Sequence, residues 1–164
     1  MMHALYEFLF EKPQLTKLKD ELQDSVLFKG LSRAELDKVV SHAQLRSFKK
    51  GDHIFFEGDS GQALFIVLRG GVQIVRHVAG KHLPLATLKK GTFFGELSLT
   101  HDLPRSAAAH VTDDALLVCL FRHDFENIVK HYPRLGTKLL TSVNQILAQR
   151  LTTAIDLSVN GNRK

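Results

Sequence analysis

Residues 63–95 read ALFIVLRGGVQIVRHVAGKHLPLATLKKGTFFG, a succession of short apolar runs separated by glycines. The runs at 63–68, 72–78 and 83–88 are rich in Val, Ile, Leu and Phe, which favour strands. Similar runs extend over about 45–121, where glycines recur at intervals of roughly ten residues. This pattern predicts about eight strands arranged as a jelly-roll barrel or double sheet.

Helical periodicity precedes the predicted β-region. Residues 1–44 carry apolar side chains at helical spacing, and Pro13 interrupts the first stretch. Ser32 followed by Glu35 is the capping-box pattern of a helix start, which predicts a helix to about Ala43. The segment before the first strand is therefore predicted to be helical.

Helical periodicity returns after the β-region. One helix is predicted over about 122–131, and a longer one over about 133–157. The last residues, 158–164, are predicted to fray. The fold class is thus mainly β with flanking helices, with an N-terminal helical segment at 1–26 and one domain at 27–157.

Composition limits the classes of protein and of partner. A chain of 164 residues with 44% apolar and 24% charged residues is typical of one globular domain. Its net charge of +5 is too small and too dispersed to indicate nucleic-acid binding. Cys119 is the only cysteine, which excludes an intrachain disulfide. The chain shows neither a signal peptide nor an apolar run of membrane-spanning length, so a cytoplasmic location and no membrane partner are expected.

Residues 93–107, FFGELSLTHDLPRSA, break the rhythm of the strands. Gly95 allows the backbone to approach a ligand closely, and a short helix after it would direct free N–H groups at an anion. Arg105 can bind two phosphate oxygens through its guanidinium fork, and Glu96 can accept a hydrogen bond from a hydroxyl. An anion site beside a hydroxyl acceptor suits a sugar phosphate.

The same segment resembles the phosphate-binding cassette of cyclic-nucleotide-binding domains, whose pattern is Phe-Gly-Glu, a short insert, and then Pro-Arg-small-Ala. The similarity extends over about Leu27 to Ile155. It implies that backbone after the glycine and the arginine hold the cyclic phosphate, and that the glutamate takes the ribose 2′-hydroxyl. The residues expected to bind the ligand are Phe94, Gly95, Glu96, Leu97, Ser98, Arg105, Ser106, Ala107 and Arg150.

The resemblance also bears on which nucleotide binds. Bacterial receptors for cyclic AMP commonly have serine after the cassette arginine, as at Ser106, so cyclic AMP is favoured and cyclic GMP stays open. Ala154 and Ile155 stand where the bacterial catabolite activators have hydroxyl residues that meet adenine. Base recognition is therefore either looser here or uses Arg150 or the neighbouring threonines. No cofactor is expected.

Other interpretations of these residues remain open. Arg105 and Glu96 are also compatible with an ordinary surface arginine and a helix-start carboxylate. A jelly roll that serves as a protein-interaction scaffold, without a nucleotide, is the alternative function. The sequence lacks the His-x-His pair of the metal-binding cupins, and no nucleophile, base and orienting group are placed together, so neither a metal site nor an enzyme is expected.

The last predicted helix carries an apolar seam with one charge in it. The seam comprises Leu140, Val143, Leu147, Arg150, Ala154 and Leu157. Arg150 in such a seam needs an anionic neighbour, and Glu96 is the candidate. The expected signal is that the nucleotide orders Glu96, which then engages Arg150 and locks the helix. The alternative is that Arg150 merely extends into solvent at the edge of the seam.

The expected partners follow from the same helix. In bacterial members of the family it pairs with its twin, so a homodimer through this helix is one option. Few residues follow Arg150, which argues against a helix-turn-helix domain and sequence-specific DNA binding. A downstream protein partner is the expected output.

Overall fold

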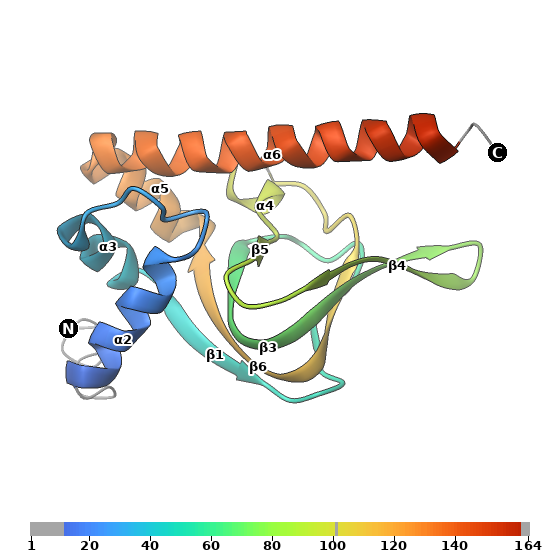
Figure 1. Cartoon of the computed structure of the whole chain (residues 1–164), viewed down its shortest axis with the longest axis horizontal. Helices are drawn as coiled ribbons and strands as arrows, with labels where there is room; N and C mark the ends of the chain where they lie inside the picture. The colour runs from blue at the N-terminus through green and yellow to red at the C-terminus, as the bar shows by residue number, and fades with distance from the viewer. Residues whose placement is uncertain (1–11, 101, 162–164) are drawn as a thin grey trace.

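An antiparallel sheet of six strands forms the centre of the molecule (Figure 1). The structure is a computed structural model that describes residues 12–100 and 102–161. The strands are β1 (Gln44–Phe48), β2 (His53–Phe55), β3 (Ala63–Val78), β4 (Lys81–Leu88), β5 (Phe93–Phe94) and β6 (Ala108–Phe121). They follow the order β1-β6-β3-β4, and the short β2 and β5 pair with β6 and β3.

The mainly β fold class with flanking helices is confirmed, but the predicted count of eight strands is wrong. The runs at 63–68 and 72–78 form one continuous strand, β3, which stays paired with β6 through register shifts around Gly70 and Gly71. Glycines there produce a bulged bend instead of a chain reversal. The sheet also ends at β1 and β4 and does not close into a barrel.

Helices lie before and after the sheet in the chain, and one short helix lies between β5 and β6. They are α2 (Lys12–Gln23), α3 (Arg33–Val40), the four-residue α4 (Leu97–Thr100), α5 (Arg122–His131) and α6 (Pro133–Gly161). The capping box predicted at Ser32 is present, with the Ser32 N–H donating to Glu35 Oε2 at 2.8 Å and the Glu35 N–H donating to Ser32 Oγ at 3.3 Å. No helix in the described part of the chain is long and apolar enough to cross a membrane.

The C-terminal end of the chain differs from the sequence prediction. α6 continues to Gly161, so residues 158–161 of the predicted frayed tail are helical. Residues 162–164 and the helix expected over 1–11 fall outside the described residues.

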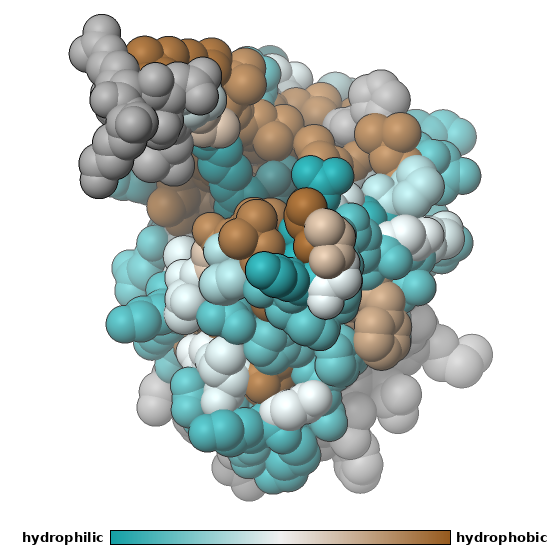
Figure 2. All heavy atoms as spheres, turned by 90° about the vertical axis from the view of Figure 1, so that its right-hand side faces the viewer, coloured by the Kyte–Doolittle hydropathy of each residue, from teal (hydrophilic) through white to brown (hydrophobic). Residues whose placement is uncertain are grey.

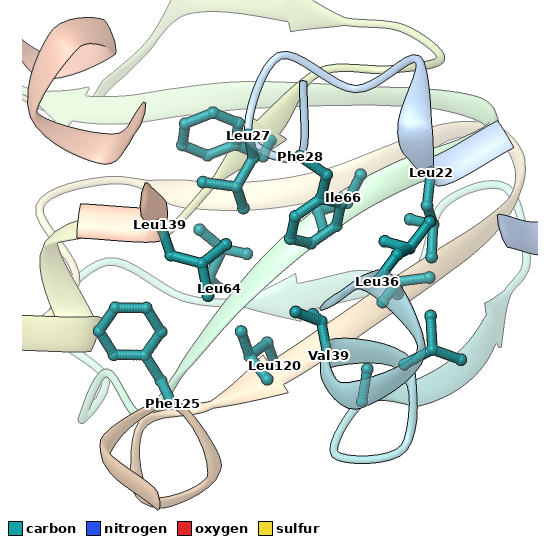
Figure 3. Packing of buried hydrophobic residues seen from close by; sticks show 14 of the residues in the cluster. Leu22, Leu27, Phe28, Leu36, Val39, Leu64, Ile66, Leu120, Phe125 and Leu139 are labelled. Atoms are coloured by element: carbon teal, nitrogen blue, oxygen red, sulfur yellow. The ribbon is translucent and has the colours of Figure 1, made fainter. Parts of the chain in front are cut away.

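The sheet carries a separate apolar core on each face, because successive residues of a strand point to opposite sides. Leu64 and Ile66 of β3 join a cluster under the helices, together with Phe28, Phe125 and Leu139 (Figure 3). The alternate β3 residues belong to a second cluster that also holds Phe94 and Cys119. The helices are thus fixed to one face of the sheet, while the second cluster lies inside the roll.

Only the first part of α6 packs on this core. Leu135, Leu139, Val143 and Ile146 are buried in it. The helix then passes above α4 and continues on the side where the β3–β4 hairpin projects (Figure 1). Seen from that side, hydrophobic atoms are exposed at the top of the molecule, where α6 runs (Figure 2). Leu151 in this later part is 63% exposed, and Ile155 and Val159 are also exposed. The end of α6 therefore presents apolar surface that the described body of the molecule does not cover.

Candidate functional site

A pocket opens between the β5–α4 segment, the residues leading into β6, and α6. Its volume is about 140 Å³. All nine residues expected from the sequence line it, and the structure adds three more to its wall, namely Phe55, Ile74 and Pro104. Segments far apart in the sequence are therefore brought together around one space.

Arg105 forms one side of this pocket and is only 7% exposed. Its Nη1 donates to Ser98 Oγ at 2.9 Å and to the Gly95 carbonyl at 3.3 Å, and its Nη2 donates to the Ala63 carbonyl at 2.8 Å. The guanidinium lies over the Phe55 ring, 4.1 Å from its centroid. These contacts hold the side chain in place with neutral groups alone.

Among the described residues, the positive charge of Arg105 has no ion-pair partner. No carboxylate among the described residues lies within ion-pair distance of it, and its buried Nε has no acceptor among them. Burial lowers the pKa of Arg105, although Asp59 and Glu96 act in the opposite direction. A buried charge without a counter-ion is costly, so this wall of the pocket favours an anion.

The backbone beside Arg105 fits the same function. Gly95 has φ +77°, and a Cβ built on it would lie 2.5 Å from Arg105 Nη1. Both the conformation and the close approach therefore require glycine. The N–H groups of Glu96 and Leu97 have no acceptor among the described residues, and both residues line the pocket.

Glu96 and Arg150 face each other across the pocket. Arg150 Nη1 lies 2.5 Å from Glu96 Oε1, and Arg150 Nη2 donates to the Phe93 carbonyl at 2.6 Å. Glu96 is 6% exposed. The predicted pair is thus present, and Arg150, whose side chain is 43% exposed, does not merely extend into solvent. That a nucleotide orders Glu96 and so brings the pair together stays a prediction.

The predicted seam along α6 needs correction in the same place. Val143 is buried in the core and the Arg150 guanidinium turns toward the pocket, so neither lies on an outer seam. The exposed large apolar side chains of α6 are Leu140, Leu151, Ile155 and Val159, whereas Leu147 is partly buried against the core. The Leu157 side chain is not among those described. The seam is displaced because α6 rests on the body along the side that the heptad pattern assigned to a partner.

The remaining expected residues take different places around the pocket. Phe94 and Ala107 are buried in its wall, and the Phe94 ring stacks on Phe65 with centroids 5.3 Å apart. Leu97 and Ser106 are exposed at its rim. Ser98 is buried, and its hydroxyl accepts from Arg105, so it supports the arginine. Ser98 therefore lines the pocket and also holds Arg105 in place.

Two contacts with the expected site residues were also not predicted. Phe55 lies under the Arg105 guanidinium, although its sequence context indicated only a strand residue. Arg122 donates from Nε to the Ser98 carbonyl at 2.7 Å. Its position as the first residue of α5 gave no sign of this contact. No group of His, Cys, Asp or Glu side chains in the described ranges is arranged to hold a metal ion.

Several known proteins are similar to this chain in sequence. A sequence model of the cyclic nucleotide-binding domain matches residues 45–132. The chain is 38% identical over 134 residues to the cyclic AMP receptor protein of Thermus thermophilus, covering 81% of this chain and 60% of that protein. It is 34% identical over 118 residues to cGMP-dependent protein kinase 2 of Homo sapiens, covering 70% and 15%.

A solved structure extends the comparison to three dimensions. The co-crystal structure of the regulatory domain of Toxoplasma gondii PKA with cAMP superposes with a TM-score of 0.67 at 28% identity. It covers 73% of this chain and 46% of that one. The chain thus spans 60% or less of the length of each of these three relatives.

Proposed function

The chain belongs to the cyclic nucleotide-binding domain family, and from this we propose that its pocket binds the cyclic phosphate and ribose of a cyclic nucleotide. The proposal includes a preference for cyclic AMP over cyclic GMP and a signal carried by α6. The protein is then a receptor module whose output depends on what α6 contacts.

The observation that carries the proposal is the buried guanidinium of Arg105, which has no carboxylate partner in the part of the chain that the structure describes. A cyclic phosphate carries one negative charge and two free oxygens, which suits a charge-assisted contact with a fork of N–H donors. The N–H groups of Glu96 and Leu97 are available on the same side. The anion would neutralise a charge that the folded protein otherwise buries at a cost.

The carboxylate of Glu96 is suited to the ribose. Arg150 engages Oε1, and Oε2 has no partner among the described residues, so it can accept from the 2′-hydroxyl. The pocket volume of about 140 Å³ is close to that of a cavity of roughly 150 Å³ that binds one benzene ring. The sugar and phosphate would therefore fill it, with the base near its mouth, beside α6.

The proposed preference for cyclic AMP rests on one residue, Ser106. Ser106 lies at the rim of the pocket, where the family resemblance associates serine with cyclic AMP. The relatives named above include both a cyclic AMP receptor and a cGMP-dependent kinase. No hydroxyl side chain of α6 lines the pocket among the described residues. Base discrimination is accordingly proposed to be modest.

The proposed output surface is the outer apolar side of α6. Leu151, Ile155 and Val159 follow one another at four-residue spacing, and all three are exposed. Spacing of this kind suits a helix–helix contact. We propose that a second copy of the chain pairs here and that a downstream protein reads the position of α6.

The direct test is titration of the purified chain with cyclic AMP and with cyclic GMP, followed by thermal unfolding. Ligand at about a hundred times its Kd stabilises by about 2.7 kcal/mol, which raises Tm by about 5–10 °C for a domain of this size. Linear 5′-AMP is the matched control. No shift with either cyclic nucleotide would instead support the scaffold alternative.

A second test addresses Glu96. Loss of the 2′-hydroxyl removes a hydrogen bond to a charged group, so 2′-deoxy cyclic AMP is expected to bind about ten- to a hundredfold more weakly than cyclic AMP, as about 1.5–3 kcal/mol requires. Competition titration measures the ratio directly. Glu96→Gln, which keeps an acceptor but not the charge, should reduce this ratio. Equal binding of the two ligands to wild type would exclude the ribose role.

A further inference from the structure

Arg122 connects the pocket to the C-terminal helices, and it does so from the first turn of α5. Its Nε donates to the Ser98 carbonyl at 2.7 Å, and its Nη2 donates to the Gly61 carbonyl at 2.5 Å. Its Nη1 lies 3.3 Å from Asp102 Oδ1. Its side chain is 20% exposed. One guanidinium therefore joins the loop before β3, the α4 turn and the start of α5.

Ser98 accepts hydrogen bonds from both Arg105 and Arg122. Its hydroxyl accepts from Arg105 Nη1 at 2.9 Å, and its carbonyl accepts from Arg122 Nε. The Gly61 backbone also lies close against Ser98, because a Cβ built at Gly61 would lie 2.0 Å from Ser98 Oγ. A displacement of Arg105 toward an anion therefore acts on the same residue that Arg122 holds.

α5 and α6 are in direct contact with each other. The two helices approach closely at Gly136, where a built Cβ would lie 2.8 Å from the Val129 Cα. Close-packed helices transmit small displacements because their contact has little free space. α6 then returns to the pocket through the Arg150–Glu96 pair. The pocket is thus connected to α6 in two ways. One runs through Arg122 and the α5–α6 contact, and the other is the Arg150–Glu96 pair.

We propose that Arg122 is a positioning residue that couples occupancy of the phosphate end of the pocket to α5 and α6. This inference rests on the proposed function. Arg122 does not touch the ligand in this scheme. It conveys the position of the α4 turn, set by Arg105 and Ser98, to the helix that carries the output. Such a coupling is a free energy between sites, so it acts on affinity as well as on the helices.

The test is amide hydrogen exchange of residues 122–157 with and without saturating cyclic AMP, together with calorimetric titration. In wild type, the ligand is expected to increase protection of α5 and α6. Arg122→Met removes the donors but keeps much of the aliphatic length. It should still bind, with affinity lowered about three- to tenfold, and should lose most of the ligand-dependent protection. Arg122→Lys is expected to recover part of it.

The control is Arg134→Met, which removes an exposed arginine from the first turn of α6 and should respond like wild type. Full ligand-dependent protection in Arg122→Met would overturn the inference, even if that variant melted at a lower temperature. If wild type binds cyclic AMP without any rise in protection, the proposed signal through α6 fails, and the inference fails with it. Absence of binding to wild type would remove the proposed function itself.

A double-mutant comparison keeps the inference testable if Arg122→Met does not fold. Ser98→Ala removes the acceptor for Arg105 but leaves the carbonyl that Arg122 uses. If the two arginines act through Ser98, the losses in cyclic AMP affinity from Ser98→Ala and Arg122→Lys should not multiply, and the deviation should exceed about threefold. Independent, multiplicative losses would contradict a shared path.

Discussion

Arg105→Ala is expected to lower the affinity for cyclic AMP by two to four decades. Removing one partner of a desolvated charge pair costs about 3–5 kcal/mol, which corresponds to that loss. In this protein the guanidinium is buried, is held by neutral carbonyl and hydroxyl acceptors, and has no carboxylate of its own among the described residues. The ligand's phosphate would therefore be its main counter-charge. Isothermal titration calorimetry measures the change.

Arg105→Lys separates charge from geometry in this experiment. Lysine keeps the positive charge but lacks the planar fork and cannot make the same set of bonds to Ala63, Gly95 and Ser98. Its affinity is expected to fall between those of wild type and Arg105→Ala. Circular dichroism checks that each variant is folded. A folded Arg105→Ala that binds cyclic AMP within threefold of wild type would show that the phosphate lies elsewhere.

Gly95→Ala is expected to weaken binding by about ten- to a hundredfold and to destabilise the fold. A non-glycine residue in the left-handed region costs about 1–2 kcal/mol, and the added methyl group would lie 2.5 Å from Arg105 Nη1 and 3.0 Å from the Ala63 carbonyl. The guanidinium must then move from its place in the pocket wall. Urea unfolding gives the loss of stability, and calorimetric titration gives the loss of affinity.

Gly91→Ala is the matched control for this variant. Gly91 has φ +84°, close to that of Gly95, but a Cβ there meets nothing within 4 Å. Both variants should lose stability through backbone strain, and only Gly95→Ala should lose binding. Similar affinities for the two variants would mean that the approach of Gly95 to Arg105 does not matter for the ligand.

The sequence by itself determined the features that depend on residues near one another in the chain. The capping box at Ser32, the helix over 122–131 and the mainly β region between the helices follow from local periodicity and turn chemistry. The family resemblance, carried by residues 93–107, is confirmed by the match over 45–132. All nine residues expected at the site line one pocket, although their contacts with a ligand remain a prediction.

The sequence predicted the partner of Arg150 but not the side of α6 that packs on the protein. An arginine among apolar helix positions predicted an anionic partner, and that partner is present. Its place in an outer seam was wrong, because a heptad pattern shows that one side of a helix is apolar but does not show which neighbour covers it. The rest of the fold decided that this side of α6 lies on the protein's own body.

Only the tertiary structure decided the remaining parts of the site. The Arg122 side chain contacts Ser98 and Gly61, which are 24 and 61 residues away in the chain, and the Arg105 guanidinium lies over the Phe55 ring. The continuity of β3 through Gly70 likewise depends on its pairing with β6. Such contacts depend on which strands pair and where each helix packs, and these are properties of the whole fold. Local periodicity records which residues are apolar, but not which distant carbonyl an arginine will reach.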